Sequence, residues 1–462
     1  MSCKRVFRRD LLRISMLASA GAALAACAQP TPEPKVVKET VQVPVKETVQ
    51  VKVKETVVVQ PTAAPVKQVQ LEVWHTVETE FDAIIPRFQL EHPNVKIKFQ
   101  YYPWGEYFQK LEIAYAGGKP PDVHRQDDDE IPAFAERGVL LPLEEHLLKK
   151  VKKEDIAWSV VESTMIGGHL WVSIPATRVG NLWYNKKLFD EAGVPYPPKT
   201  FPSNDWTWDK FVEVCRKLTK PEKMQYGFLG ADSPDFIVFL GRSNGGKILS
   251  DDCMQFLMHE APMTDMIQAC TDLMHKKPVG AVDPETQRAM GGAEMFNTGK
   301  VAMQYGQTRG GPATVKVPFE WDYAGLPIIA GKKPIVFAAI ECHGVAKATK
   351  FPEEAAAFAV FLMDKVAQDI FAKTKTVIPI NKAAADAWVK RIPQNRQILV
   401  DSAAYGQTLP FAVGFAKVQE IAWPMLAEVT NNQKTAQQAM TAAKPLCDAA
   451  LKDAGGCLGK KK

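Results

Sequence analysis

Aromatic and acidic side chains stand at the ends of three predicted strands early in the globular part of the chain. The set comprises Trp74, His75, Tyr102, Trp104, Asp127 and Asp128. Planar rings stack on the apolar C–H faces of a sugar, and carboxylates accept hydrogen bonds from its hydroxyls. These residue types at strand ends predict a binding site for a polyhydroxylated ligand.

Two of these positions have a second interpretation. His75 is equally compatible with a hydrogen-bonded histidine of the core. The acidic stretch from Asp127 to Glu130 could be a solvated turn. It could also bind calcium, although its spacing does not resemble an EF-hand loop.

An enzyme is the rival hypothesis, and one motif raises it. Gly241-Arg242-Ser243-Asn244-Gly245 matches the GxSxG pattern of serine hydrolases and follows an apolar run, Phe236 to Leu240. That motif requires a strand, a sharp turn and a helix. The following residues, Gly245-Gly246 and Ser250-Asp251-Asp252, make a poor helix, so the match is interpreted as coincidental.

Other catalytic patterns are weaker. The same stretch reads G-x-x-x-x-G-K, but Ile248 stands where a phosphate-binding loop needs Ser or Thr. A glycosidase would need two carboxylates across a cleft, for which Asp127 and Glu341 are the candidates. With no HExxH or CxxC pattern, we expect no metal, no cofactor and no catalytic activity.

The elements that would position these residues alternate between strand and helix. Predicted strands cover 71–75, 95–102 and 121–126, and predicted helices cover 81–92, 106–118 and 131–138. The alternation favours an α/β fold with mostly parallel sheets. Downstream, Trp206 and Trp208 are interpreted as a helix entry and core pair rather than ligand contacts.

Charge is distributed unevenly along the 462 residues. The formal net charge is +5, but residues 1–67 hold eleven basic and five acidic side chains, which leaves −1 for residues 68–462. A nearly neutral body argues against a nucleic-acid partner. A hydrophobic content of 46% is typical of a packed globular protein rather than a disordered one.

Residues 1–26 have the pattern of an export signal. A basic stretch containing Arg8-Arg9 precedes an apolar stretch, Ile14 to Ala26. The arginine pair resembles a twin-arginine signal, although Phe7 stands at the usual Ser or Thr position, so the general secretory route stays open. Leu24-Ala25-Ala26-Cys27 resembles a bacterial lipobox, which implies cleavage before Cys27 and a lipid on its thiol.

Residues 27–67 are predicted to form a lipid-anchored, flexible tether. VKETVQV occurs at 37–43 and 45–51, and VKETVVV follows at 53–59. Prolines and alternating charges leave no core to bury. Pairing of the Val-rich repeats as a strand is the minority alternative.

Cysteine usage fits an exported protein without proving disulfides. After Cys27 the chain contains Cys215, Cys253, Cys270, Cys342, Cys447 and Cys457. Only Cys447 and Cys457 are close enough in sequence to suggest a local pairing, and six cysteines allow fifteen connectivities.

An ordered series of motifs resembles the extracellular solute-binding proteins of ABC importers, in the maltose-binding-like family that mostly binds carbohydrates. In chain order the motifs are LEVWHT, FQLEHPNVKIKF, AGGKPPDV, AERGVLLPLEEHL, GGHLWVSIPA, LWYNKKLFDEAGVPYPPKT, WTWDKFVEVCRKLT, MFNTGKVAMQYG and FPEEAAAFAVFLMDKVAQDIFAKTKTVIPI. Each motif alone is weak, but the ordered set covers residues 70 to 380.

The resemblance implies two α/β lobes joined by crossovers near 174–182, 335–340 and 386–391. The N-lobe would combine 68–178 with 340–387, and the C-lobe 182–336 with 392–458. Ligands of such folds lie at the carboxyl ends of strands, and hinge closure encloses them.

The resemblance also implies further ligand-binding residues at the crossovers and in the VAMQYGQTR stretch. They are Arg178, Asn181, Tyr305, Arg309, Phe337 and Glu341. Arg309 stands where the family usually has Trp. We therefore expect a monomeric, membrane-anchored lipoprotein that captures a carbohydrate and delivers it to an ABC permease; a ligand sensor without transport is an alternative.

Overall fold

The computed structural model describes residues 67–76, 80–126, 128, 130–292, 294–308, 311–313, 315–374, 377–390 and 394–456. The chain divides into two compact units, Met1–Ala63 and Ala64–Lys462, and every described residue belongs to the second. The predicted signal, lipobox cysteine and repeats lie outside the described residues. No helix in the described part of the chain is long and apolar enough to cross a membrane.

The six elements predicted at the start of the body are confirmed, with ends that shift by a few residues. They are β1 (Val69–His75), α1 (Phe81–Glu91), β2 (Val95–Tyr101), α2 (Trp104–Ala116), β3 (Val123–Gln126) and α3 (Ile131–Glu136). In β1, alternate residues are fully buried, as expected for a strand with one face on a core.

The chain continues through a long strand into a mainly helical region. The elements are α4 (Glu144–Lys150), α5 (Trp158–Ser163), β4 (Val172–Asn185), α6 (Lys186–Ala192), α7 (Trp208–Leu218), β5 (Tyr226–Leu229), α8 (Pro234–Ser243), α9 (Ala261–His275), α10 (Pro284–Ala289) and α11 (Glu294–Asn297). Three short 3₁₀ helices, Lys153–Asp155, Pro221–Lys223 and Gly311–Ala313, lie in the connections.

The last third of the body adds five more strands after β5 and a helical end. These elements are β6 (Val301–Gln307), β7 (Trp321–Ala324), β8 (Val336–Val345), α12 (Pro352–Phe361), α13 (Lys365–Thr374), β9 (Ile378–Pro379), α14 (Lys382–Val389), α15 (Gln397–Ala403), β10 (Gly406–Gln407), α16 (Phe415–Thr430) and α17 (Ala436–Asp453). A capping box of Thr435 and Gln438 begins α17.

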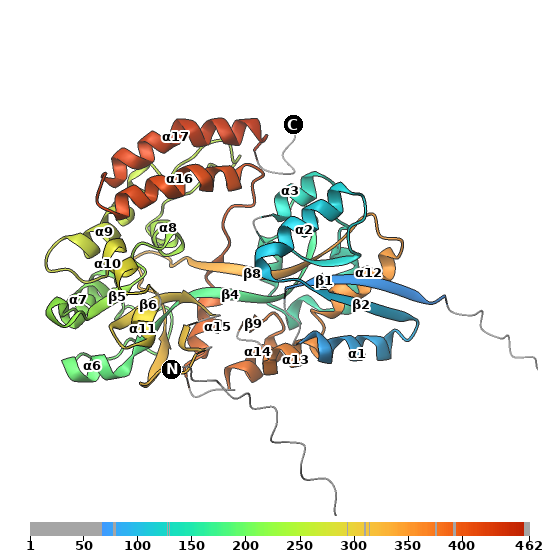
Figure 1. Ribbon diagram of the computed structural model, residues 1–462, viewed down its shortest axis with the longest axis horizontal. Coiled ribbons are helices and arrows are strands. Elements are labelled where there is room, and N and C mark those ends of the chain that lie inside the picture. The colour runs from blue at the N-terminus through green and yellow to red at the C-terminus, as the bar shows by residue number, and fades with distance from the viewer. Residues whose placement is uncertain are drawn as a thin grey trace, which may run out of the picture. The chain divides into compact units, whose positions relative to one another are not determined.

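Strands run in the order β2-β1-β3-β8-β4-β6-β5. The pairs β1–β2, β1–β3 and β5–β6 are parallel, as predicted, but β8 pairs antiparallel with β3 and β4, and β4 pairs antiparallel with β6 and β7. The expectation of mostly parallel sheets is therefore wrong. The physical reason is that β4 and β8 pass between the two groups of strands in opposite directions (Figure 1).

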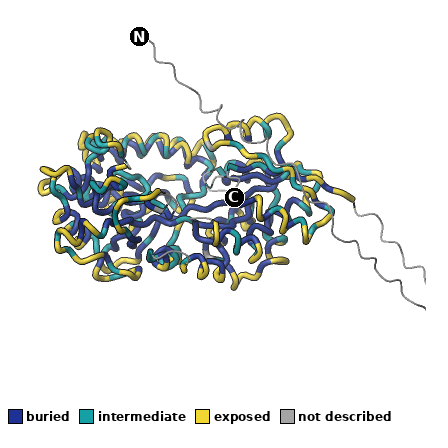
Figure 2. The backbone as a smooth tube through the Cα atoms, turned by 60° about the horizontal axis from the view of Figure 1, so that its bottom comes forward, coloured by how far each residue is buried: buried dark blue, intermediate teal, exposed yellow. Residues whose placement is uncertain are grey.

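Buried side chains form three clusters around these strands. Figure 2 marks the backbone of buried residues in dark blue. One cluster lies against α1, α12 and α13, and a second lies on the other face of the same strands against α2, α3 and α5. The third surrounds β5 and β6 and includes Trp206 of the predicted core pair, with Trp208 packed against it. Helices on both faces of a sheet are the arrangement expected of an α/β fold.

The predicted pairing of Cys447 with Cys457 is wrong. Cys447 is a free, buried thiol, as are Cys215, Cys270 and Cys342. Cys447 lies on α17 among the buried residues of that helix, where an apolar thiol packs well. Cys253 is disulfide-bonded, and Cys457 lies outside the described residues.

Candidate functional site

Two aromatic side chains meet where β1 and β2 end. The rings of Trp74 and Tyr102 have centroids 4.8 Å apart and planes inclined by 58°. Each ring is held by a hydrogen bond, because Trp74 Nε1 donates to Glu72 and the Tyr102 hydroxyl donates to Gln100. The pair is partly exposed and offers the planar apolar surface that the sequence predicted.

His75 lies on the other face of β1, because successive side chains of a strand point to opposite faces. It is 2% exposed, and its ring lies 4.6 Å from Phe81 and 5.1 Å from His343. Glu341, which pairs with Ala176 across β8 and β4, is also buried. The structure therefore places these two predicted residues inside the packed interior.

Asp128 and Phe337 are brought together in a small cavity of about 80 Å³. Asp128 Oδ2 accepts a hydrogen bond from the backbone N–H of Ile340 at 3.4 Å, which ties the loop after β3 to β8. Phe337 packs on Phe239 with centroids 5.2 Å apart. The remaining walls are Thr408 to Phe411, Phe415 and Gln419, a segment that the sequence did not single out.

A second group of polar side chains lies at the junction of β4, β6 and α8. We call Arg178, Asp235, Tyr305 and Gln307 the polar cluster. Gln307 Nε2 donates to Asp235 Oδ2 at 3.5 Å, and the Tyr305 ring lies 5.3 Å from Phe236 of α8. In the register of β4 and β6, Gly180 pairs with Gln307 and Leu182 with Tyr305, so these side chains share one face.

Gly180 makes room for the Tyr305 ring. A Cβ at Gly180 would lie 2.9 Å from the Tyr305 hydroxyl oxygen and 3.1 Å from a ring carbon. Gly230, with φ of +114°, makes the same kind of room at the other side, because a Cβ there would lie 2.8 Å from Tyr305 Cβ. Both glycines are therefore required for the position of this ring.

Several polar atoms of the cluster have unused hydrogen-bonding capacity. Arg178 Nε and the Tyr305 hydroxyl are buried and have no hydrogen-bond partner among the described residues. Burial raises the pKa of Asp235, opposed by the bond from Gln307 and the charge of Arg178. Burial raises the pKa of Tyr305 well above its ordinary value, and the charge of Asp235 adds to this. The cluster offers donors and an acceptor suited to ligand hydroxyls.

Asn181 is separated from this cluster by the pleat of β4. Asn181 is fully buried and pairs with Gly306 of β6. Because it lies three residues after Arg178 in the same strand, its side chain points to the opposite face. Its Nδ2 donates to the carbonyl of Val179, and its Oδ1 has no partner in the described part of the chain. The structure thus does not bring Arg178 and Asn181 together.

Sequence reasoning missed Asp235 and the nearby Asp232, whose pKa values are both raised by burial. The available signal was local. Gly230, which has a positive φ, follows β5, and Pro234 begins α8, so the two mark a strand end and a helix start. Asp232 lies between them, and Asp235 directly follows Pro234. That strand end was hidden because Tyr226–Leu229 is only four residues long.

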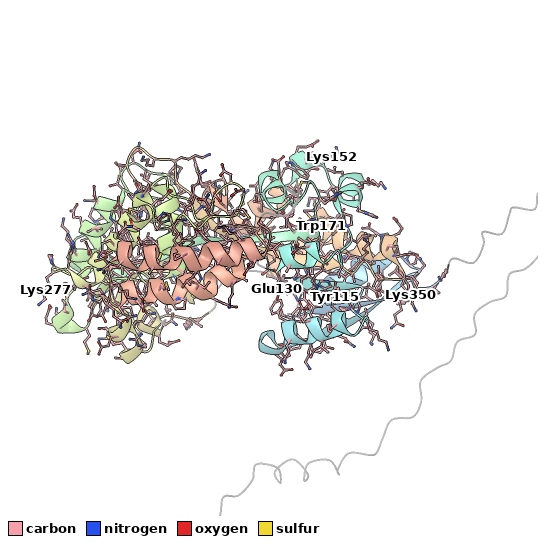
Figure 3. The ribbon with its side chains drawn as sticks, turned by 90° about the horizontal axis from the view of Figure 1, so that it is seen from above. Tyr115, Glu130, Lys152, Trp171, Lys277 and Lys350 are labelled. Carbon is pink, nitrogen blue, oxygen red and sulfur yellow. The ribbon has the colours of Figure 1, made fainter. Side chains whose placement is uncertain are left out.

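Some predicted residues lie outside the described set. Asp127 and Arg309 are not described, and nothing is described of the Trp104 side chain beyond its place at the start of α2. Where β3 passes into α3, Gln126 Nε2 donates to Glu130 at 2.9 Å. Glu130 is labelled in Figure 3. No group of three His, Cys, Asp or Glu residues that could hold a metal occurs among the described residues.

The GxSxG motif does not form a nucleophile elbow. Ser243 is the last residue of α8, so the segment before it is a helix rather than the strand that an elbow requires. The residue Ser243 is 6% exposed. Its hydroxyl accepts a hydrogen bond from the N–H of Ile335, with 2.8 Å between N and Oγ, and donates to the carbonyls of Phe239 and Ile335. The apolar run Phe236 to Leu240 forms part of the helix α8. It is buried because it packs in the largest of the three core clusters.

Comparison with known proteins agrees with this architecture. The family model of the bacterial extracellular solute-binding protein matches residues 75–369. The maltotriose-binding protein of Pyrococcus abyssi is 27% identical over 187 residues. This match covers 40% of this chain and 38% of that protein, so it spans well under half of the relative. The diacetylchitobiose-binding protein DasA of Streptomyces coelicolor is 24% identical over 346 residues, 73% of this chain and 78% of that protein.

A solved structure shows the same fold. An ABC substrate-binding protein of Listeria monocytogenes, in complex with cycloalternan, superposes with a TM-score of 0.72 at 21% identity, covering 84% of this chain and all of that one. The α/β fold is therefore the two-lobed, maltose-binding-like fold that the sequence predicted. The chain belongs to the bacterial extracellular solute-binding protein family.

Proposed function

We propose that this protein is an extracytoplasmic solute-binding lipoprotein that captures a carbohydrate between its lobes and delivers it to an ABC import permease. It binds and releases its ligand without a catalytic cycle. The observation that carries the proposal is the polar cluster, in which buried donor atoms without partners among the described residues stand beside the partly buried carboxylate of Asp235. Such groups are costly when unpaired and are satisfied by a ligand rich in hydroxyls.

The ligand would lie between two walls. Trp74 and Tyr102 supply the stacking surface of the N-lobe, Asp128 adds an acceptor after β3, and the polar cluster supplies the hydrogen bonds of the C-lobe. A sugar needs both kinds of contact, because its ring faces are apolar and its rim is polar. The undescribed Asp127 and Arg309 are proposed to join these walls.

We place the proposed lobe boundaries at β4 and β8, the long strands that connect the two walls. The N-lobe comprises 68–178 and 340–387, and the C-lobe 182–336 and 392–458, with β4 and β8 as two of the crossovers. Rotation of the lobes about these crossovers would close the site on the ligand.

We infer that the ligand is an oligosaccharide. Relatives are named for binding maltotriose and diacetylchitobiose, and a structural neighbour holds cycloalternan. These three ligands differ in linkage and substituents, so a panel of oligosaccharides is the appropriate probe. Loops set such specificity on a shared scaffold.

The proposal is tested by thermal unfolding of the protein in the presence of a panel containing maltotriose, diacetylchitobiose and monosaccharides. A ligand at a hundredfold excess over its Kd stabilises the folded state by about 2.7 kcal/mol. We expect at least one oligosaccharide to raise the Tm. Stabilisation by peptides or polyols, with none by any sugar, would overturn the carbohydrate assignment.

A further inference from the structure

A further cavity shares the segment Thr408–Phe411 with the small cavity at Asp128 and Phe337. It measures about 710 Å³, within the range of small-molecule sites. Its walls are the turn Ser163–Gly167 after α5, the segment 245–253 after α8, and the segment 407–411, together with Arg242 and Ile335. None of the described ligand-binding residues predicted from the sequence lines it.

The walls are held in place by hydrogen bonds. Ile166 and His169 form an isolated bridge, and Trp171 Nε1 donates to the carbonyl of Ile166 at 3.0 Å. Across the cavity, Cys253 is disulfide-bonded. The cavity is therefore bounded by ordered segments from both sides of the β4–β8 crossing.

Arg242 brings a positive charge to this cavity without an acidic partner. Its guanidinium donates to the backbone carbonyl of Thr408 at 3.0 Å and to Gln407 Oε1, and it lies 4.9 Å from the ring of Phe239. Among the ion pairs of the described residues, none includes Arg242. Desolvation lowers its pKa to about 10, so it stays charged at neutral pH.

Other charges at the cavity cancel. Lys247 and Asp251 form an ion pair at 2.8 Å, and both side chains are exposed. Arg242 is the one other charged residue among those lining the cavity, so the lining carries a net charge of +1. A desolvated charge that is hydrogen-bonded only to neutral oxygens is costly, and an anion would offset that cost.

We propose that this cavity binds a small organic monoanion whose carboxylate contacts Arg242. The two bonds to Gln407 and Thr408 use two of the five guanidinium N–H groups, which leaves donors for a carboxylate. The apolar part of the ligand packs on Met165, Ile166 and Leu409. The cavity shares the segment Thr408–Phe411 with the cavity at Asp128, but Arg242 is not among the residues proposed to bind the sugar, so different variants test the two proposals.

The first test is calorimetric titration of the whole protein with sodium hexanoate and with hexanamide. The two probes have the same shape, but only hexanoate carries a charge. We expect hexanoate to bind saturably and at least about tenfold more tightly than hexanamide, as charge-assisted hydrogen bonds are the stronger ones. Equal affinity of the two probes, or no saturation by hexanoate up to tens of millimolar, overturns the proposal.

Variants then locate the binding. Arg242→Gln should weaken hexanoate binding about tenfold or more, Arg242→Lys should weaken it less because the charge remains although the planar guanidinium is lost, and Arg87→Gln on the exposed face of α1 should change nothing. Because Arg242→Gln removes two hydrogen bonds, Ser163→Asp provides a second test at an exposed wall residue. Its added carboxylate should weaken hexanoate but not hexanamide. Unchanged hexanoate binding by folded Arg242→Gln or Ser163→Asp protein contradicts the assignment.

Discussion

At the scale of single residues, the burial of Asp235 makes the stability of the fold depend on pH. Its folded-state pKa is raised, chiefly by desolvation, so burying its charge destabilises the folded protein once the pH exceeds the ordinary carboxyl value. This cost is absent at low pH, where the carboxyl is protonated in both states. It is fully present above the raised pKa.

Replacing Asp235 by Asn should therefore stabilise the protein in a pH-dependent way. The free energy of unfolding of Asp235→Asn minus that of the parent should increase from pH 4 to pH 7, measured by urea denaturation. Asp265→Asn, at an exposed position on α9, serves as the control and should show a flat difference. A difference for Asp235→Asn that is constant, or that falls as the pH rises, contradicts the account.

Tyr305 permits a separation of binding from stability. Its hydroxyl is buried and has no partner among the described residues, so Tyr305→Phe should leave the free energy of unfolding unchanged or raise it slightly. Sugar affinity should fall roughly two- to tenfold, the value of one hydrogen bond. Tyr101→Phe, at an exposed ring, should alter neither. If Tyr305→Phe is less stable than the parent but binds sugar equally well, the Tyr305 hydroxyl stabilises the fold and does not bind the ligand.

Residue identity was easier to predict than side-chain direction. The sequence correctly placed aromatic residues at the ends of β1 and β2, but it treated Trp74 and His75 as one group. The pleat sends them to opposite faces, and the same holds for Arg178 and Asn181. Asp235 was missed because its partners, Arg178 and Gln307, are far away in sequence and meet only through the register of β4 with β6.

At the scale of elements, periodicity was sufficient for the first six strands and helices, because each has a clear apolar pattern and ends at Gly or a polar turn. Strand direction was not predictable in the same way. β8 lies between β3 and β4, more than 150 residues away from either, and such long-range pairing leaves no local signal.

Gly227 is the position where β5 and α7 approach most closely. A Cβ there would lie 2.0 Å from the carbonyl oxygen of Cys215 in α7, so the strand and helix would have to separate. Gly227→Ala should lower the free energy of unfolding by about 1–3 kcal/mol, as overpacking does. The control, Gly105→Ala on α2, meets no atom within 4 Å and should stabilise by up to about 1 kcal/mol. Equal effects of the two changes in urea denaturation would contradict this packing.

At the scale of the whole molecule, residues 1–67 carry the net positive charge, +6 against −1 for residues 68–462, and are proposed to export and anchor the protein. Cys27→Ser removes the proposed lipid attachment point while leaving the body unchanged. The variant should move from the membrane fraction to the soluble fraction of cells. Cys447→Ser, at a free cysteine of the body, should stay with the membrane. Retention of Cys27→Ser in the membrane fraction would rule out this anchor.

The central claim is that a sugar binds the body at the polar cluster. The most direct measurement is calorimetric titration of an oligosaccharide from the panel into the parent protein, Arg178→Met and Arg87→Met. The parent should bind one sugar per chain, and Arg178→Met should bind roughly tenfold or more weakly, because a charged hydrogen-bond donor is lost. Arg87→Met, at an exposed position of α1, should match the parent. Absence of binding by every sugar, or equal affinity of the parent and Arg178→Met, would contradict the account.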